Sequence, residues 1–460
     1  SSGLELFKNG SFFNNLSNLF SDRERYIYSF ADSNNTFFLN AMADAKFIAS
    51  KGDILNNKNV TLIQWGGKAR GTINRNFGYY LLATNGQRIG QKELVFSDPS
   101  MRNNYKLNEL DQRNFDFTEG YVCYDGGSFS FQLGRERITI GSGYNEKMLV
   151  SSVNAMDFIK MEFEIGAVNY TFLHNWILTK PTKLEYNEFE VDGRIVDSKY
   201  LALHRLGISL CKNNIEIGLS EMIVYSNRPP EIAYMTPLIF YKSVEHSLQD
   251  RDNALLAFDG SARITGGLKL YGTLVVDELD FSKIGTNWWG NLFSYQIGGF
   301  VTEPFGIENL DVNAEYIKIV PYTYSHKFIE NNYTNFNSFI GPNMHPNSDK
   351  LYFNFKYAVS YRLAFDLGIS YERHGSNLKD GNGNVIKNVG GDINFGHRYE
   401  DSEEVTFLDG EVEKKTALSA LVNYEIFNNI FFSAAFIHNI ASGVRDTKQN
   451  MVNFILNINY

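Results

Sequence analysis

The final stretch of the chain, Met451 to Tyr460, reads MVNFILNINY and is the segment that most clearly indicates the fold. Side chains along a β-strand point alternately to its two faces. Here Val, Phe, Leu, Ile and Tyr occupy every second position from Val452 onward, and three of the four residues between them are asparagines. The stretch therefore predicts a strand with one face toward lipid or a hydrophobic core and the other toward water.

The same alternation recurs throughout the chain. Residues 351–359 and 363–372 each carry a run of apolar residues on one face and mostly polar or small residues on the other. We identify about eighteen such segments, which begin near residues 36, 60, 75, 119, 128, 159, 168, 199, 215, 255, 268, 289, 312, 350, 363, 415, 430 and 451.

The connections between these segments alternate in length. Tight turns fall at residues 125–127, 166–167, 211–214, 266–267, 360–362 and 427–429, and long polar stretches at about 85–118, 141–158, 179–198, 226–254, 326–349 and 374–414. An even-stranded outer-membrane barrel has short periplasmic turns and long extracellular loops. The sequence therefore predicts an all-β fold, a transmembrane antiparallel β-barrel of about 18 strands. Residues 302–311 are an exception, a periplasmic turn of about ten residues.

Composition narrows the class of protein. The 460 residues include 43 Lys and Arg against 52 Asp and Glu, a net charge of −9. This argues against a nucleic-acid binder, because neutralising phosphates requires a basic surface. No run approaches the roughly 18 apolar residues of a transmembrane helix, so a helical membrane protein is excluded. Cys123 and Cys211 have no metal-ligand spacing, and we expect both to be unpaired.

Residues 1–35 precede the first predicted strand. A short amphipathic helix is predicted there, because apolar residues recur at helical spacing after Ser11: Phe12, Phe13, Leu16, Leu19 and Phe20. The helix would plug the barrel lumen from the periplasmic side or lie on the membrane surface. We therefore expect an N-terminal periplasmic or plug segment at 1–35 and an outer-membrane barrel at 36–460.

The sequence carries no pattern typical of an enzyme active site. Its 8 histidines are scattered, and neither a Gly-x-Ser-x-Gly elbow nor a His-Glu-x-x-His pair is present. The stretch Asp380 to Asn384 resembles the start of a calcium loop, but Val385 and Gly391 stand where such a loop needs Gly and Glu. A hairpin tip is favoured there. We expect no enzyme activity, no metal site and no cofactor.

Two segments depart from plain alternation. In the first, the apolar phase of residues 129–133 is opposite to that of Ile138 and Ile140, which predicts a one-residue β-bulge near Gly134. Arg135 to Arg137 would then form a charge cluster at the outer rim, either as a ligand site or as a structural salt-bridge ladder. In the second, Trp288 and Trp289 follow a strand that ends in acidic residues. They would stack on sugar rings or belong to the aromatic girdle at the membrane interface.

These segments resemble a known family. The run from Gly134-Arg135 through Gly141-Ser142-Gly143 to Asn154-Ala155, the strand end at Tyr271 to Leu279, and Phe407 to Glu411 look like Wzi-type capsule-assembly proteins. The resemblance extends over about residues 60–460. It implies an outer-membrane barrel of about eighteen strands that helps to hold capsular polysaccharide at the cell surface. The Phe-, Tyr- and Asn-rich composition also resembles outer-membrane proteins of Bacteroidetes.

We therefore expect a bacterial outer-membrane barrel that binds or anchors surface polysaccharide through its extracellular loops. The candidate glycan-binding residues are Arg135, Arg137, Tyr144, Asn154, Asp157, Asp277, Asp280, Trp288 and Trp289. Expected partners are outer-membrane lipid, surface polysaccharide and other outer-membrane proteins, with no nucleic acid.

Two alternative functions stay open. One is a channel selective for a small solute, because eighteen strands can enclose a pore. The other is a scaffold that docks surface or secretion proteins. Alternation places a set of polar residues toward the lumen, as either a pore or a closed barrel requires: Asn354, Lys356, Asp366, Glu372, Asn423, Glu425, Asn453 and Asn457.

Overall fold

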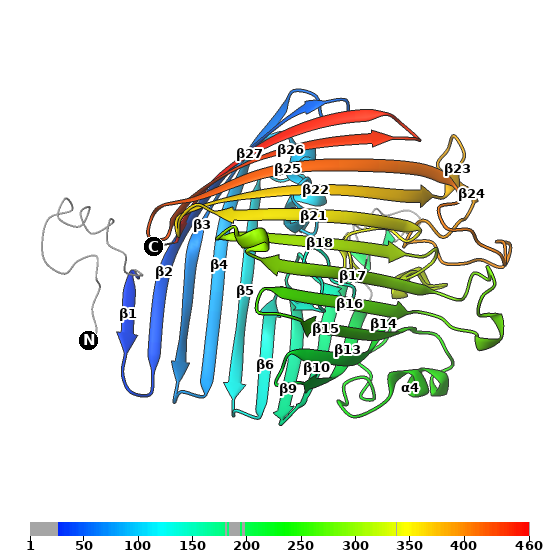
Figure 1. Cartoon of the computed structure of the whole chain (residues 1–460), viewed down its shortest axis with the longest axis horizontal. Helices are drawn as coiled ribbons and strands as arrows, with labels where there is room; N and C mark the ends of the chain where they lie inside the picture. The colour runs from blue at the N-terminus through cyan, green and yellow to red at the C-terminus, as the bar shows by residue number, and fades with distance from the viewer. Residues whose placement is uncertain (1–25, 180–181, 184–193, 196–197, 337, 460) are drawn as a thin grey trace, which may run out of the picture.

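The computed structural model describes residues 26–179, 182–183, 194–195, 198–336 and 338–459. Its main feature is a 19-stranded antiparallel sheet, of which 18 strands close into a barrel (Figure 1). The wall strands in order are β2 (Thr36–Gly52), β3 (Lys58–Ile73), β4 (Phe77–Gly90), β5 (Asn114–Asp125), β6 (Phe129–Glu136), β9 (Met156–Ile165), β10 (Val168–Leu178), β13 (Ser198–Leu210), β14 (Ile215–Ser226), β15 (Asn253–Arg263), β16 (Leu268–Val276), β17 (Phe293–Thr302), β18 (Leu310–Ile319), β21 (Ser348–Ala358), β22 (Leu363–Ser376), β25 (Glu411–Phe427), β26 (Ile430–Ser442) and β27 (Thr447–Asn459).

The predicted strand pattern is confirmed. Each predicted segment corresponds to one wall strand, and no start differs by more than 5 residues. The predicted tight turns join neighbouring strands at one end of the barrel, and the long connections lie at the other end. An outer-membrane barrel carries its long loops on the extracellular side, so the short turns mark the periplasmic mouth. No helix in the described part of the chain is long and apolar enough to cross a membrane.

The wall closes where the first strand meets the last. β27 pairs with β2 from Met42↔Asn459 to Gly52↔Gln449. Beyond this point β1 (Tyr28–Ala31) pairs with residues 36–39 of β2 and continues the line of β27. This short strand was not predicted. The predicted N-terminal helix falls within residues 1–25, outside the described residues.

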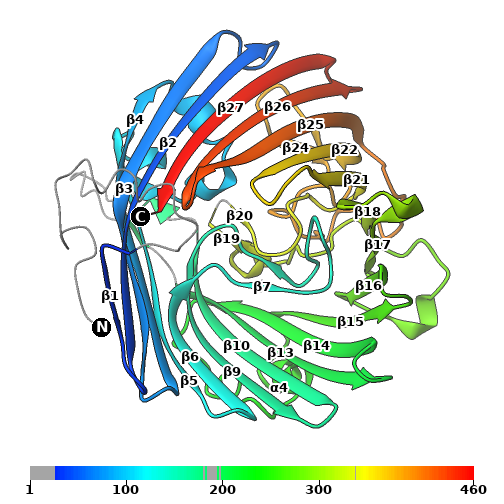
Figure 2. The same ribbon diagram turned by 60° about the vertical axis from the view of Figure 1, so that its left-hand side comes forward.

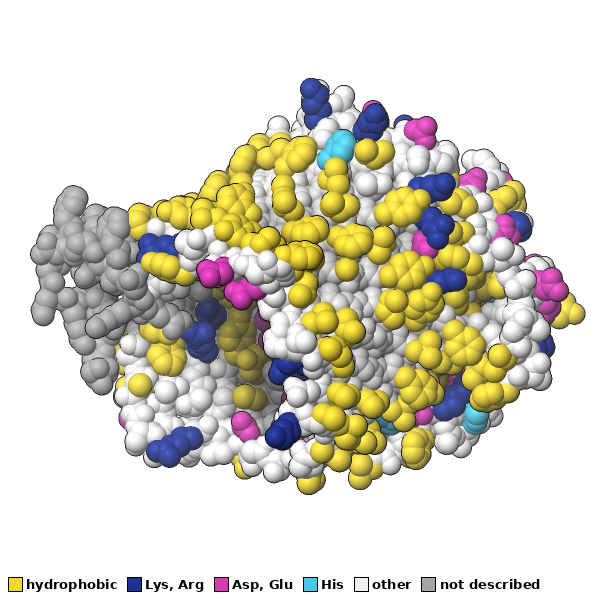
Figure 3. Space-filling model, viewed as in Figure 1, with side chains coloured by type: hydrophobic (Ala, Val, Ile, Leu, Met, Phe, Trp, Pro, Cys, Tyr) yellow, Lys and Arg dark blue, Asp and Glu magenta, His cyan; other side chains and the backbone are white. Residues whose placement is uncertain are grey.

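The two faces of the wall differ as alternation requires. The outer face of β21 exposes Leu351, Phe353, Phe355 and Tyr357, and Figure 3 shows hydrophobic side chains in a broad field across the visible outer wall. The inner face carries polar groups. Asn354 is 3% exposed, and its amide lies 2.5 Å from Oδ1 of Asp366.

The other residues predicted for the lumen lie on the same inner face. Lys356 is in register with Asp366, and Glu372 with Lys350. Nearer the periplasmic mouth, Asn423 accepts from the Ser433 hydroxyl and Glu425 from the Asn429 amide. Asn457 donates to Asp44, whereas Oδ1 of Asn453 is buried without a hydrogen-bond partner.

Four extracellular loops fold inward and pack against the lumen wall (Figure 2). Three of them, residues 137–155, 320–347 and 377–410, contribute to one hydrophobic cluster with Met148, Tyr333 and Ile393 among its members. The inner faces of β9 to β18 supply the rest of this cluster. The loop at 91–113 forms a second cluster against β2, β3 and β5. The extracellular half of the lumen therefore contains a packed core.

These loops contain short elements of their own. Helical segments are α2 (Lys92–Val95), α3 (Tyr105–Asn108) and α4 (Tyr241–Ser247), with 3₁₀ turns η3 (Pro99–Met101), η4 (Phe281–Lys283), η5 (Pro304–Gly306) and η6 (Ile329–Asn331). The loop strands are β7 (Thr139–Ile140), β8 (Val150–Ser151), β11 (Thr182–Lys183), β12 (Arg194–Ile195), β19 (Thr334–Asn335), β20 (Ser338–Phe339), β23 (Leu378–Lys379) and β24 (Val385–Lys387). Residues 380–384 form the tip of the β23–β24 hairpin, where Asp380 accepts from the amides of Asn382 and Asn384.

The predicted β-bulge near Gly134 is wrong. β6 pairs with β5 and with β9 in regular register through this glycine. The apolar phase changes because the chain leaves the wall after Glu136 and enters the lumen. Ile138 is therefore buried in the inner core, whereas Leu133 faces lipid.

Candidate functional site

A notch in the extracellular rim follows from the early end of β6. β5 begins at Asn114, but its pairing with β6 begins only at Gly120, opposite Arg135. Beyond Glu136 the chain turns into the lumen and returns at Met156. Residues 114–119 of β5 therefore have no β6 partner, and the wall is open between β5 and β10 at this height.

A cavity of about 350 Å³ occupies this opening, and we call it the notch pocket. Its lining includes, from the outer face, Asp116, Arg135, Asp157 and Trp176, and from the lumen side, Phe117, Glu119, Arg137, Asn154 and Asn335. The loop at 91–113 contributes Asn103, Tyr105 and Lys106. Four of the predicted glycan-binding residues meet here: Arg135, Arg137, Asn154 and Asp157.

Each cation of the notch pocket is paired with an acid. Arg135 lies 2.7 Å from Asp157, Arg137 lies 2.9 Å from Glu119, and Lys106 lies 2.8 Å from Asp116. The salt-bridge ladder considered from the sequence is therefore present. Because the pairs are balanced, the pocket offers charged hydrogen-bonding groups without a net charge among them.

Amides and aromatic rings complete the notch pocket. Asn154 donates to the Ser338 hydroxyl at 2.8 Å, and Asn103 donates to the carbonyl of Asn335 at 2.8 Å. Both Tyr105, which is 50% exposed, and the half-buried Trp176 line the pocket. Apolar ring faces next to amides and ion pairs are the combination that binds sugar rings and their hydroxyls.

A second cavity, of about 260 Å³, lies at the rim above β15–β17, and we call it the tryptophan pocket. Trp288, Trp289 and Asp277 line it together with Tyr322 and His397. The indole of Trp289 stacks on His397, with ring centroids 3.9 Å apart and planes at 4°. The Lys283 ammonium lies over the Trp288 ring, 4.1 Å from its centroid, in a cation–π contact. The indole Nε1 of Trp288 donates to Glu403 at 2.9 Å. Both tryptophans therefore belong to the loops.

Carboxylates are concentrated in the tryptophan pocket. Its lining contains Glu245, Asp250, Asp252, Asp277 and Glu278, against Lys242 and Lys327. Burial raises the pKa of Asp277 to about 8, although the Tyr324 amide donates to it at 2.6 Å. Burial likewise raises the pKa of Glu245 to about 7, against the opposing effect of Lys242. The pocket is therefore acidic and its charge changes near neutral pH.

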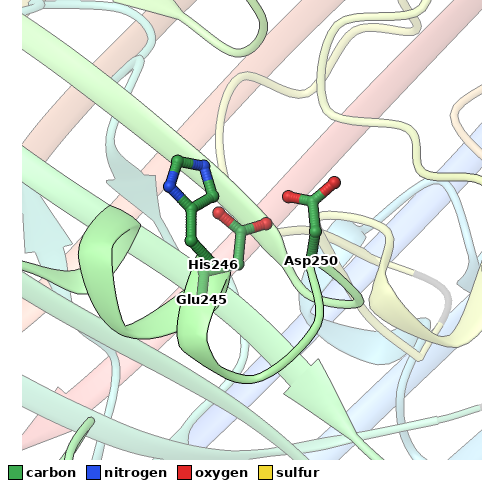
Figure 4. Close-up of side chains that lie close together, drawn as sticks. All are labelled: Glu245, His246 and Asp250. Atoms are coloured by element: carbon green, nitrogen blue, oxygen red, sulfur yellow. The ribbon is translucent and has the colours of Figure 1, made fainter.

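Glu245, His246 and Asp250 bring potential metal-ligand atoms within 4.8 Å of one another (Figure 4). Lys242 forms ion pairs with both carboxylates of this cluster. Nζ of Lys242 lies 2.7 Å from Glu245 and 3.8 Å from Asp250. The ammonium group provides the positive charge that a metal ion would otherwise supply.

Two predicted glycan-binding residues lie outside both pockets. Tyr144 is in the lumen, where its ring lies 5.9 Å from Phe300 and its backbone amide donates to Glu315 at 2.8 Å. Asp280 caps the η4 turn by accepting from the Ser282 amide at 2.9 Å. Both residues stabilise their loops in this structure.

The sequence did not identify several residues that line the pockets. Asn103 and Lys106 belong to the loop at 91–113, Trp176 to the end of β10, and His397 to the loop at 377–410. They are far apart in the chain and meet only because the barrel closes and the loops fold inward. The apolar run Met148-Leu149-Val150 inside a predicted polar loop was the available signal that loops enter the lumen.

The raised pKa of Asp277 predicts a pH dependence of stability. In the folded protein this carboxyl keeps its proton up to about pH 8, whereas its ordinary value is 3.8. The folded state therefore binds more protons between these values, and its stability falls as pH rises. We expect Asp277→Asn to melt close to the wild type at pH 4 and above it at pH 8, measured by scanning calorimetry. A difference that does not change with pH would contradict this.

The closed barrel, its lipid-facing wall and its loop-filled lumen define a bacterial outer-membrane β-barrel. A family model described as capsule assembly protein Wzi matches residues 58–439, and the chain belongs to this family. No curated protein matches the chain.

Solved structures agree on the fold. The barrel is similar to Wzi of Escherichia coli, described as an outer-membrane protein involved in group 1 capsule assembly and a carbohydrate-binding β-barrel, with a TM-score of 0.56, 10% identity and coverage of 90% of this chain and 83% of that one. It is also similar to OprD of Pseudomonas aeruginosa, with a TM-score of 0.50, 9% identity and coverage of 92% and 93%.

Proposed function

We propose that this barrel binds capsular polysaccharide at the notch pocket without making or breaking a covalent bond. The observation that carries the proposal is the convergence there of three balanced ion pairs, several asparagine amides and three aromatic rings. Membership of the Wzi family and the carbohydrate binding described for the Escherichia coli protein support it.

The tryptophan pocket is the second proposed contact. It lies on a different part of the rim, so one polymer chain could touch both pockets. Linked weak contacts add up because the second binding event is intramolecular. The acidic lining of this pocket suits a hydroxyl-rich segment of the polymer better than a carboxylate-rich one.

The channel alternative has a specific observation against it. A pore needs a continuous water-filled lumen, whereas the extracellular half of this lumen holds the hydrophobic cluster described above. No specific feature of the described loops supports the scaffold alternative.

The exposed ion pair of the notch pocket provides the test. Arg135 and Asp157 are 47% and 57% exposed, so their removal costs under about 1 kcal/mol of stability. If they bond sugar hydroxyls, Arg135→Ala with Asp157→Ala should weaken binding at least tenfold, since hydrogen bonds to charged groups contribute about 1.5–3 kcal/mol each. Binding is measured with the protein in nanodiscs and capsular polysaccharide from the source strain.

A matched control lies on another loop. Lys387 and Asp409 form an exposed ion pair at 2.8 Å, and neither residue lines either pocket. The variant Lys387→Ala with Asp409→Ala should bind polysaccharide within about twofold of wild type. Equal affinity of the two double variants would refute the notch pocket as the binding site.

A further inference from the structure

One extracellular loop differs from those that enter the lumen, because it folds over the outside of the barrel. We call residues 227–252 the external strap; it includes α4, which Figure 1 shows beyond the wall strands. It covers the outward-facing side chains Tyr200, Ala202, Ile223 and Tyr225, which form a hydrophobic cluster with Tyr234 and Tyr241 of the strap.

Polar contacts fix the external strap against the wall. The Tyr241 amide donates to Glu221 at 2.9 Å, and the Tyr241 ring lies 4.4 Å from His204. Arg228 lies over the Tyr225 ring at 4.9 Å and pairs with Asp252 at 2.6 Å. The strap is therefore held at several points along its length.

The strap reaches down to the lipid-facing surface. The Tyr170 hydroxyl donates to the carbonyl of Pro237. Tyr170 is in register with Leu206, and Leu206 with Leu219. Leu206 and Leu219 are 43% and 38% exposed, and both belong to the apolar outer wall. The segment around Pro237 is thus level with the first lipid-facing residues.

On this side of the barrel the part of the wall left exposed is too short to span the membrane core, because the strap covers the apolar residues above it. The exposed apolar column of β13 runs only from Leu206 to Leu210. At about 3.3 Å per residue this is about 13 Å along the strand, against an apolar band of about 25 Å in outer-membrane barrels. On β21 and its turn the corresponding column extends from Leu351 to Val359. Above Leu206 the wall presents His204 and Glu221, which the strap covers.

The outer surface of the strap supplies the missing apolar area. Ile232, Leu238 and Phe240 are 81%, 88% and 70% exposed. All three lie on the segment that flanks Pro237. Exposed large apolar side chains that are concentrated on one segment indicate a surface with a partner, and here the segment continues the lipid-facing wall.

We infer that residues 232–240 of the external strap are embedded in the outer leaflet, with Ile232, Leu238 and Phe240 in contact with its acyl chains. The strap is then an in-plane membrane element, similar in principle to an interfacial helix with one apolar face. It continues the apolar band where it covers the upper parts of β13 and β14. This inference does not depend on the proposed glycan binding.

Spin-label accessibility tests the inference. Cys123 and Cys211 are replaced by serine, and single cysteines are placed at Ile232, Leu238 or Phe240 for labelling. Reference labels are placed at Ile208, which is 42% exposed on the lipid-facing wall, and at Asn382, on the exposed hairpin tip. Each protein is reconstituted into phosphatidylcholine liposomes after its heat-dependent gel shift confirms a folded barrel.

Collision rates with oxygen and with a water-soluble nickel chelate distinguish the outcomes. The ratio of oxygen to nickel accessibility at the strap positions is expected to match that at Ile208 and to exceed that at Asn382 severalfold. A ratio equal to that at Asn382 would show that the strap faces water and overturn the inference. Labels shielded from both reagents would overturn it too, by showing that a second copy of the chain or another protein covers the strap. Three independent positions keep the test valid if one variant fails to fold.

Discussion

Replacing Glu315 by leucine is expected to give resolvable single-channel openings in planar bilayers, where we expect the wild-type barrel to be silent. Glu315 is 2% exposed on the inner face of β18. Its carboxylate accepts from three consecutive backbone amides, those of Tyr144, Asn145 and Glu146, at 2.8, 3.3 and 3.2 Å. It also accepts from the Tyr271 hydroxyl at 2.8 Å. One side chain thus fastens the loop at 137–155 inside the lumen.

Leucine removes this acceptor and leaves the three amides buried without it. Hydrogen bonds to a charged group contribute about 1.5–3 kcal/mol each, and a buried unpaired donor costs a further 1–3 kcal/mol or so. Losses of this size are comparable to the free energy of local unfolding of a loop, so we expect the loop to open. Conductance is measured with the purified protein, and hydrogen exchange of the peptide at 137–155 reports loop release directly.

The control for this variant is Glu425→Leu. Glu425 also lies on the inner face, but it accepts from Asn429 in a periplasmic turn, away from the extracellular loops. The Glu425→Leu variant should show no channel openings and no change in the hydrogen exchange of residues 137–155. If Glu315→Leu also stays silent and its loop exchanges as slowly as in wild type, Glu315 does not hold the loop.

Among the substitutions proposed here, Arg205→Leu should lower the free energy of unfolding the most. Arg205 bonds both oxygens of Asp259 at 2.9 and 2.7 Å and lies 2.8 Å from Glu216. The Asp259 side chain is 1% exposed. Gly207 and Gly218 make room for the guanidinium, because a Cβ at Gly218 would lie 2.5 Å from Nη2 of Arg205. Loss of one partner of a buried ion pair costs about 3–5 kcal/mol.

The unfolding free energy of Arg205→Leu is measured by guanidinium titration in detergent micelles. Adding Asp259→Asn should recover most of the loss, because the isolated buried charge is then removed. Arg263→Leu, at the exposed end of β15, serves as the control and should change stability by no more than about 0.5 kcal/mol. A full loss that persists in the double variant would assign the effect to packing instead of charge.

The wall of this barrel could be predicted from sequence because each strand meets lipid on one face and polar groups on the other. That contrast is visible in the local sequence as an alternation of residue types, as in Leu351 to Ala358. The local sequence of the loops does not indicate their path in this way. Tyr333 looks like an isolated apolar residue in a polar stretch, and only its place in the hydrophobic cluster of the loops and the wall explains it.

The candidate site was predicted in part for the same reason. Arg135 and Asp157 could be found because they lie at the ends of paired strands, where alternation places them at the rim. Trp176 and Asn103 could not, because their place in the notch pocket depends on the early end of β6 and on the inward fold of the loop at 91–113. The phase change after Leu133 contains this information, because it marks a departure from the wall and not the predicted bulge.

The seam between β2 and β27 has a kinetic consequence. Every other wall contact joins strands that follow one another along the wall, through connections far shorter than the separation at the seam. The seam joins residues about 400 positions apart, a closure with the largest entropic cost in the molecule. Until the last strand is available, the hydrogen-bonding edge of β2 stays unpaired and is open to wrong partners. The order of assembly is therefore set by the end of the chain, and truncation there should leave an aggregation-prone open sheet.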